Sequence, residues 1–574
     1  MKVDLKKSPY FLTDTQIENI EAIIGAMSIE EKCGQLFCDV QNYCDFWATL
    51  ERIKNKHVGA VMAAGGTLED VKAKIAQMQD CARLPLMIAA NLESGGNGIF
   101  EEGTYYGKQM QIAATKDVNC AKILGEICAR EGRLAGVNWA FAPVADINYN
   151  FRNPITSVRT YGSDAGLVGE MVRHYVTSLQ EFGVAASVKH FPGDGVDERD
   201  QHYVMSVNSL SCEEWDKSYG QVYQAAIEEG VLTIMAGHIA MPAYEEYFSG
   251  QALYRPATQS ENIITGLLKG KLGFNGMVTT DATQMIGFCS SLKREAALVQ
   301  AINCGCDMLL FFVDFDEDYQ WVLEACRDGR IRSERIEDAL RRILGVKMRL
   351  GLFERGNMPL KLSGSGATLP EFPEMLPFAE AFAQIQHDHK VLAKECADAA
   401  ITLVKDTRKL IPVRPEKYRR VLLEILGDSP ANSKVEAWFK KYMEQRGFEV
   451  STYSMEVLES SKDTVGEFKA KYDLVLYVGN IDDSVGGPAA RIQWRHQAGH
   501  GNHIPWFVRE VPTVCISLGS PYLLLNLPMI STYINGYSNS EFVVRAAVEK
   551  LSGESGFYGE NPVDPFCGYE DTKL

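Results

Sequence analysis

The feature that most limits the possible folds of this chain is a repeated alternation of short apolar runs with longer helical patterns. The alternation extends over residues 30–352. Short apolar runs between turn signals are typical of buried strands, and repeated β/α units predict a parallel sheet. Seven or eight such units suit a closed, TIM-like (β/α)8 barrel better than an open doubly wound sheet. The predicted strands lie at 58–62, 86–90, 137–144, 184–188, 232–236, 276–280 and 308–313.

A second, smaller α/β sandwich domain is predicted after the barrel. A helical pattern at 331–350 ends at Gly351, and three glycines and three prolines at 354–374 are typical of a linker. After another helical stretch at 378–400, a new set of strands is predicted. We therefore expect a barrel at 1–353, a linker and helix at 354–395, and the sandwich at 396–574. The strands of the second set lie at 421–426, 448–453, 474–478, 513–518 and 531–535.

Composition excludes several classes of protein. A length of 574 residues exceeds what one hydrophobic core usually serves. The formal net charge of −17 argues against nucleic-acid or anionic-membrane partners, which require a basic surface. Residues 1–10 carry charge without a following apolar segment, and no later run is long enough to span a bilayer, so we predict a cytoplasmic protein. The 14 cysteines lack CxxC spacing, which favours free thiols, mostly in the core.

No cofactor is predicted. The turn at 519–521 lacks the glycine spacing of a dinucleotide site, and no Gly-Lys pair precedes Ser or Thr as a phosphate loop requires. His496, His500 and His503 are a weak candidate metal site, because Gly499, Gly501 and Pro505 break the helix that would align them, so no metal is predicted. They lie in an irregular stretch at 486–506, for which a substrate-covering lid and a solvated surface loop are equally open interpretations.

Polar residues follow nearly every predicted barrel strand. A single such residue is usually a cap or a satisfied core group. Their coincidence at the carboxyl ends of barrel strands, where barrel enzymes carry their chemistry, indicates an active site instead. These residues are Asn91, Glu93, Asp146, Lys189, His190, His238 and Asp281.

The segment Lys-His-Phe-Pro-Gly-Asp-Gly at 189–195, followed by Asp200-Gln201-His202, indicates cleavage of a sugar bond. Such cleavage needs one group that attacks or stabilises the anomeric carbon and another that protonates the departing oxygen. Asp281 suits the first role, because it would project from a rigid strand into the barrel mouth. His202 suits the second role, because an imidazole held by the carboxylate of Asp200 is a proton shuttle suited to neutral pH.

With these residues identified, the chain resembles glycoside hydrolase family 3, specifically its β-N-acetylhexosaminidase branch. The resemblance covers most of the chain, and its sharpest motifs all lie in the barrel half. In the opening motif, Ser28 and Glu31 are placed as a capping box. The motifs lie in order at 27–37, 141–147, 159–162, 189–195, 273–276 and 342–347.

The resemblance implies roles for individual residues. Asp281 would be the nucleophile of a retaining reaction, and His202 the acid/base on a mobile loop with Asp200 as its orienting partner. The Asp-x-His feature favours an N-acetyl sugar, because relatives acting on plain glucosides usually carry a carboxylic acid elsewhere for that role. Four residues would bind sugar hydroxyls by resemblance, and Asn91, Glu93 and His238 complete the predicted substrate-binding set. The four are Asp146, Arg159, Lys189 and His190.

This chain departs from the family pattern at three positions. Asn91 replaces an Asp that usually grips sugar hydroxyls, and an amide donates as well as accepts hydrogen bonds. Asp194 stands where the Pro-Gly-x-Gly loop usually has His. Ala282 replaces the Asp that usually follows the nucleophile, which removes a carboxylate beside Asp281.

The leading functional hypothesis is a retaining exo-β-N-acetylhexosaminidase that removes terminal β-linked N-acetylglucosamine or a close relative. The first alternative is a phosphorylase, because a neutral histidine repels phosphate less than a carboxylate does. A β-glucosidase and a non-catalytic sugar-binding protein are the others. The sequence leaves open the gluco or galacto preference, the linkage, the aglycone and the oligomeric state.

Overall fold

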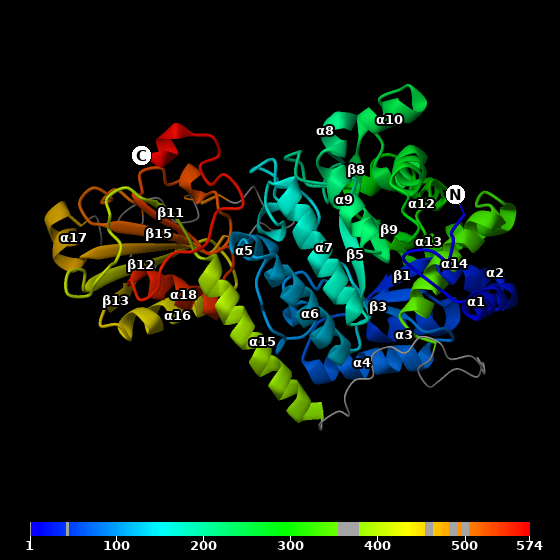
Figure 1. Ribbon diagram of the computed structural model, residues 1–574, viewed down its shortest axis with the longest axis horizontal. Coiled ribbons are helices and arrows are strands. Elements are labelled where there is room, and N and C mark those ends of the chain that lie inside the picture. The colour runs from blue at the N-terminus through cyan, green and yellow to red at the C-terminus, as the bar shows by residue number, and fades with distance from the viewer. Residues whose placement is uncertain are drawn as a thin grey trace. The chain divides into compact units, whose positions relative to one another are not determined.

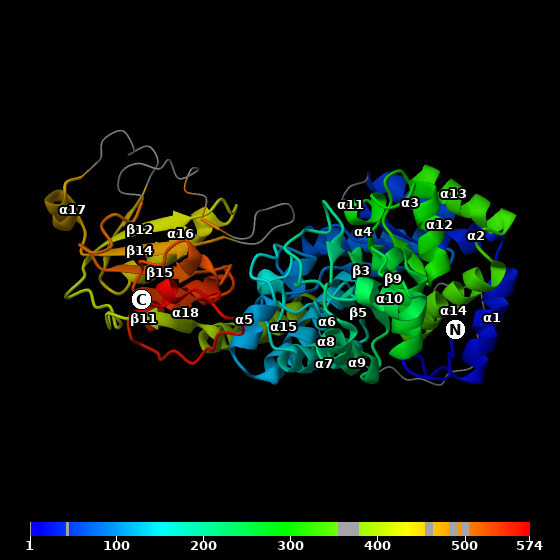
Figure 2. The same ribbon diagram turned by 90° about the horizontal axis from the view of Figure 1, so that it is seen from above.

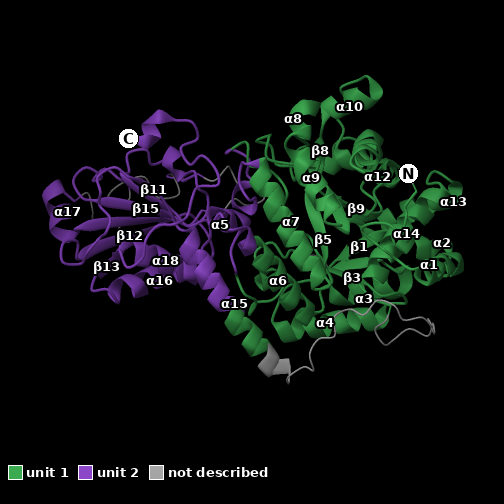
Figure 3. Ribbon diagram, viewed as in Figure 1, with its two compact units in different colours: residues 1–105, 121–150, 165–388 green, residues 106–120, 151–164, 389–574 purple. Residues whose placement is uncertain are grey.

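The computed structural model describes residues 2–41, 45–353, 378–453, 463–481, 491–492, 494 and 504–574. They form two compact units, which Figure 3 colours separately. Unit 1 comprises residues 1–105, 121–150 and 165–388, and unit 2 comprises 106–120, 151–164 and 389–574. The predicted linker at 354–374 lies outside the described residues.

Unit 1 contains a closed barrel of eight parallel strands arranged in chain order, which confirms the predicted TIM-like fold (Figure 1). Each strand pairs in parallel with its neighbours, and the first strand closes the ring against the last. The first strand, Phe37–Val40, was missing from the predicted set because its four residues carry a weak apolar signal. The strands are β1 (Phe37–Val40), β2 (Ala60–Met62), β3 (Met87–Ala90), β4 (Trp139–Ala140), β5 (Ala185–Phe191), β7 (Thr233–Ala236), β9 (Met277–Ala282) and β10 (Met308–Leu310).

Helices surround these strands, as the two views in Figures 1 and 2 show. The predicted capping box is confirmed: the Ser28 hydroxyl accepts the Glu31 amide and Glu31 accepts the Ser28 amide at the start of α2. The described helices of unit 1 are α1 (Asp14–Ala26), α2 (Ile29–Gly34), α3 (Phe46–Lys56), α4 (Leu68–Cys81), α6 (Val118–Ala135, begun in unit 2), α7 (Ala165–Glu181), α8 (Cys212–Asp216), α9 (Tyr219–Glu228), α10 (Pro242–Ser249), a π-helix at Asn262–Lys271, α11 (Ile286–Cys289), α12 (Arg294–Cys304), α13 (Phe315–Asp328) and α14 (Ser333–Arg349).

Helix α14 fixes the start of β9, the strand that ends in Asp281. Arg342 is 1% exposed, and its guanidinium donates to the carbonyl oxygens of Asn275 and Gly276, each at 2.7 Å. Burial of so large a charged side chain is tolerated because its donors are satisfied and Asp338 pairs with it at 3.0 Å. The 342–347 motif therefore has a structural role, because it anchors the strand that carries the predicted nucleophile.

Unit 2 is built on a six-stranded sheet of order β11-β16-β15-β14-β12-β13. The edge strand β11 (Thr402–Asp406), which was not predicted, runs antiparallel to β16. Alternate residues of the central strands enter two separate cores, as Leu423 and Leu476 do on one face and Leu422 and Tyr477 on the other. The predicted α/β sandwich is thus confirmed. Its other elements are β12 (Arg420–Leu426), β13 (Glu449–Thr452), β14 (Leu474–Gly479), β15 (Thr513–Ser517), β16 (Thr532–Asn535), α5 (Gln109–Ala114), α15 (Phe378–Ala400, begun in unit 1), α16 (Asn432–Glu444), α17 (Val465–Lys471) and α18 (Glu541–Leu551).

Two segments of the predicted barrel stretch, 106–120 and 151–164, pack within unit 2. Met110 and Val158 share a buried cluster with Tyr522 and Tyr537 of that unit. The division therefore differs from the contiguous ranges expected from sequence, because apolar residues in these two segments find their partners late in the chain.

Every cysteine among the described residues is a free thiol, and Cys33, Cys128, Cys396 and Cys515 are examples of buried ones. Within the same described residues, no helix has the length and apolar character needed to cross a membrane.

Candidate active site

Lys189 and His190, the last polar residues of β5, are each held by a carboxylate. The Lys189 Nζ lies 2.6 Å from Glu93 Oε1, and both side chains are largely buried. His190 Nδ1 lies 2.7 Å from Asp146 Oδ2. Because a carboxylate accepts hydrogen bonds, Nδ1 carries the proton in this pair and Nε2 faces away from Asp146. Asp146 is fully buried and holds His190, and its expected contact with a sugar hydroxyl stays a prediction.

Asp281 lies at the end of β9 with its side chain 16% exposed. Its Oδ1 accepts the amide of Ala282 at 2.7 Å, and its Oδ2 lies 3.9 Å from His190 Nε2. Burial raises the pKa of Asp281, but the charges of His190, His238 and His202 and the Ala282 amide outweigh burial, so the pKa lies below its usual value. Asp281 is therefore a carboxylate at neutral pH, which is the form a nucleophile requires.

Asp200 and His202 form the close pair expected from the sequence. His202 Nδ1 lies 2.6 Å from Asp200 Oδ1, which also accepts the His202 amide at 2.8 Å. The His202 side chain is 28% exposed. With Nδ1 held by a carboxylate, Nε2 is the nitrogen that can exchange a proton with a ligand. After this loop the chain forms β6 (Ser206–Val207), which pairs in parallel with β8 (Ile239–Ala240).

His238 has a different environment from the other two histidines. It is fully buried, and Nε2 lies 3.0 Å from the carbonyl oxygen of Ala282, so Nε2 carries the proton. Its Nδ1 lies 3.0 Å from the Thr258 hydroxyl. Both ring nitrogens are thus engaged by protein, one of them by the carbonyl of Ala282 next to Asp281, and the sugar contact expected from sequence stays a prediction.

His238 gives the protein a pH-dependent stability. Burial lowers the pKa of His238 from 6.5 to about 4, which the charge of Asp281 only partly opposes. Between these values the unfolded chain binds a proton that the folded chain does not, so stability is full above the unfolded pKa and is lost as pH falls toward the folded one. We expect wild type to lose about 2 kcal/mol more than His238→Gln between neutral pH and pH ~5. Denaturant unfolding of both proteins tests this, and parallel pH profiles would contradict it.

The remaining predicted residues have distinct placements. Asn91 is exposed just after β3, and its amide has no hydrogen-bond partner within the described part of the chain. Asp194 is 1% exposed; its amide donates to Asp146 Oδ1 at 2.7 Å. Arg159 ends the short helix Ser157–Arg159, which belongs to unit 2, so its part in the site stays a prediction.

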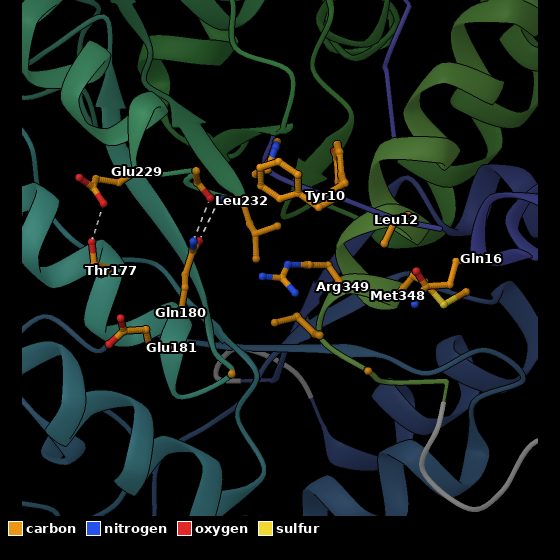
Figure 4. A pocket seen from close by; sticks show the side chains of 16 residues that line it. Tyr10, Leu12, Gln16, Thr177, Gln180, Glu181, Glu229, Leu232, Met348 and Arg349 are labelled. Atoms are coloured by element: carbon orange, nitrogen blue, oxygen red, sulfur yellow. Dashed lines mark hydrogen bonds between the residues drawn. The ribbon is translucent and has the colours of Figure 1, made fainter. Parts of the chain in front are cut away.

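At the carboxyl ends of the barrel strands, His190 contacts both Asp146 and Asp281, and its neighbour Lys189 pairs with Glu93. A separate cavity of about 330 Å³ lies at the opposite end of the barrel (Figure 4). Its lining includes Leu232, which directly precedes β7, and Arg349, which ends α14. None of the predicted site residues lines that cavity.

Gln201 and Gly287 were not among the predicted site residues, although both contact the loop that carries His202 or the residues beside it. Gln201 is fully buried, and its Oε1 accepts the His238 amide at 2.7 Å. A Cβ on Gly287 would lie 2.7 Å from the Gln201 carbonyl oxygen, so only glycine allows this approach. The position of Gln201 inside Asp-x-His was the one available signal.

No group of His, Cys, Asp and Glu side chains suited to a metal occurs among the described residues. His496, His500 and His503, together with most of the 486–506 stretch, lie outside them.

Comparison with known proteins identifies the family. A model for the glycosyl hydrolase family 3 N terminal domain matches residues 28–346, more than half of this chain of 574 residues. The chain belongs to glycosyl hydrolase family 3. It is therefore a glycoside hydrolase family 3 enzyme, and its order of motifs follows from that membership.

Two full-length relatives of this family 3 enzyme carry different names. A protein of Cellulomonas fimi named beta-N-acetylglucosaminidase/beta-glucosidase is 39% identical over 100% of both chains. A solved structure named beta-glucoside phosphorylase BglX is 38% identical, with a TM-score of 0.89 over 99% of each chain. A family 3 beta-N-acetylglucosaminidase from Paenibacillus sp. str. FPU-7 shares the fold, with a TM-score of 0.76 at 24% identity, covering 94% of this chain and 99% of its own.

Proposed function

We propose that this enzyme is a retaining exo-β-N-acetylhexosaminidase that removes terminal β-linked N-acetylglucosamine or a close relative. The observation that carries the proposal is the Asp200–His202 pair, at 2.6 Å, on a loop hydrogen-bonded to the connection after Asp281. The name of a Pseudoalteromonas piscicida beta-hexosaminidase A, 26% identical over 59% of this chain and 56% of its own, supports the N-acetyl sugar, and the name of the Cellulomonas fimi relative covers both an N-acetylglucosaminidase and a glucosidase.

The proposed reaction has two displacements. In the first, an Asp281 oxygen attacks the anomeric carbon, the bond to the leaving oxygen breaks, and the protonated Nε2 of His202 gives that oxygen a proton. In the second, His202 takes a proton from water, the resulting oxygen attacks the anomeric carbon, and Asp281 departs. Two inversions preserve the β configuration. His190 and the Lys189–Glu93 pair would bind sugar hydroxyls beside Asp281.

Phosphorolysis is the second candidate, and the full-length likeness to beta-glucoside phosphorylase BglX favours it. In the second displacement the acid/base is a neutral imidazole, whereas a carboxylate would carry negative charge. Two like charges 4 Å apart repel by about 4 kcal/mol at the effective dielectric of a protein surface. A phosphate acceptor beside the neutral His202 does not meet the repulsion that a carboxylate would exert on it. The product would be the β-sugar 1-phosphate.

We expect faster turnover of the p-nitrophenyl β-glycoside of N-acetylglucosamine than of glucose, with the β anomer as the first product seen by NMR. A first-formed α anomer would contradict retention, and equal or greater turnover of the glucoside would contradict the N-acetyl preference. The same reaction in phosphate buffer separates the two candidates. Free sugar as the sole product supports the hydrolase, whereas sugar 1-phosphate would show that the enzyme is a phosphorylase.

We also expect Asn91→Asp to change sugar binding. Asn91 is exposed after β3, and a carboxylate there would make charge-assisted hydrogen bonds to sugar hydroxyls, about 1 kcal/mol stronger than those of the amide. The KM for the preferred p-nitrophenyl glycoside should fall about fivefold. An unchanged KM would show that Asn91 does not contact the sugar.

A further inference from the structure

The loop that carries His202 is attached to the chain that carries Asp281 by main-chain hydrogen bonds. The amide of Ile286 donates to the carbonyl oxygen of His202 at 3.0 Å, and the amide of Gly287 donates to that of Gln201 at 3.1 Å. Both donors begin α11, only a few residues beyond the nucleophile. The acid/base loop and the nucleophile therefore share one βα connection.

The side chain of Gln201 closes this attachment into a ring. Gln201 is fully buried, and its Oε1 accepts the amide of His238 at 2.7 Å. The imidazole of His238 in turn donates from Nε2 to the carbonyl oxygen of Ala282 at 3.0 Å. The ring is closed as follows: hydrogen bonds link Gln201 to His238 and His238 to Ala282, the chain runs from Ala282 to Gly287, and the Gly287 amide bonds back to the Gln201 carbonyl.

Gln201 also faces Asp194, one of the departures from the family pattern. Its Nε2 lies 3.5 Å from Asp194 Oδ2, the outer limit of a hydrogen bond. The Asp194 amide donates to the same Asp146 that orients His190. A glutamine suits this position because its side chain carries both a donor and an acceptor. The NH2 group donates toward the Asp194 carboxylate, and the oxygen accepts the His238 amide.

We propose that Gln201 is a positioning residue that fixes His202 relative to Asp281. This inference rests on the proposed roles of His202 and Asp281. In the chain, Gln201 and His202 are adjacent; the Gln201 side chain is buried in the ring, while the His202 side chain is partly exposed. Removing the hydrogen-bonding groups of Gln201 leaves the buried His238 amide without its acceptor and releases one side of the loop.

The expected effect is selective. A displacement of about 1 Å at a reacting group costs up to ~100-fold in rate. Gln201→Met keeps the approximate size of the side chain and should lower kcat/KM about 10- to 100-fold for a β-linked disaccharide, whose leaving group needs a proton. For a p-nitrophenyl glycoside, whose leaving group needs none, the loss should stay below about threefold. In a His202→Ala background, the second substitution should add no leaving-group dependence.

The control is Gln224→Met, because Gln224 is partly exposed on α9 and donates to Glu228 of its own helix, away from the ring around Gln201. It should leave both substrates unchanged. If Gln201→Met proves unfolded by thermal melting, Gly287→Ala makes the same test, because its Cβ would displace the Gln201 carbonyl and should produce the same selectivity.

Two failures can be told apart. Equal losses on both substrates, with His202→Ala still selective for the leaving group, would overturn the positioning role and leave the proposed function intact. A His202→Ala enzyme with no leaving-group selectivity would overturn the proposed function itself.

Discussion

Asp281→Ala should reduce kcat/KM for every substrate by about 10⁴-fold or more, whatever the leaving group, because loss of a catalytic nucleophile removes the covalent path entirely. Asp281 suits this role because its pKa lies below the usual value despite its burial, so that it is ionised at neutral pH. The measurement is kcat/KM for p-nitrophenyl glycosides and for a disaccharide, with thermal melting to show that the variant folds.

The matched control for this prediction is Asp314→Asn. Asp314 is an exposed carboxylate that caps α13 through the amide of Glu317, and its replacement should leave activity unchanged. If Asp281→Ala keeps a tenth of wild-type activity on any substrate, Asp281 is not the nucleophile.

His202→Ala should reduce kcat/KM for a β-linked disaccharide by about 10²- to 10⁴-fold while sparing p-nitrophenyl glycosides. The difference arises because p-nitrophenolate leaves without a proton, whereas a sugar alkoxide does not. The kcat for p-nitrophenyl glycosides should still fall, because the second displacement needs His202 as a base for water. Azide needs no general base, so it should restore kcat by accepting the glycosyl group, and the product should be a β-glycosyl azide. Asp200→Asn should show the same pattern with a smaller loss, because it only holds His202 Nδ1.

An equal loss on activated and natural substrates, with no response to azide, would assign the acid/base role to another residue. The control for the histidine is His174→Ala, since His174 lies on α7 beside Glu170, away from the strand ends.

The barrel was predictable because burial on both faces makes parallel strands continuous apolar runs, which remain visible in a single sequence. The strand-end residues followed from the fold, and in the structure His190 contacts both Asp146 and Asp281 directly. β1 escaped prediction because its run is short and contains Asp39, which is buried against Arg52.

Other features depend on contacts that no local pattern encodes. The segments 106–120 and 151–164 pack in unit 2 because their apolar partners occur hundreds of residues later. His238 follows a strand as a ligand-binding residue would, but its complete burial and its bond to Ala282 are visible only in three dimensions. Gln201 lies between two residues with clear chemistry, yet only the ring of contacts around its side chain reveals what it does.

The most direct test of the account is to trap the covalent intermediate. A 2-deoxy-2-fluoro glycoside with an activated leaving group slows the departure of the sugar from the nucleophile, so the glycosyl-enzyme accumulates and can be located by mass spectrometry of peptides. We expect one adduct, on Asp281 at the end of β9. An adduct on another carboxylate, such as Glu93 or Asp146, or continued turnover without any adduct, would contradict it.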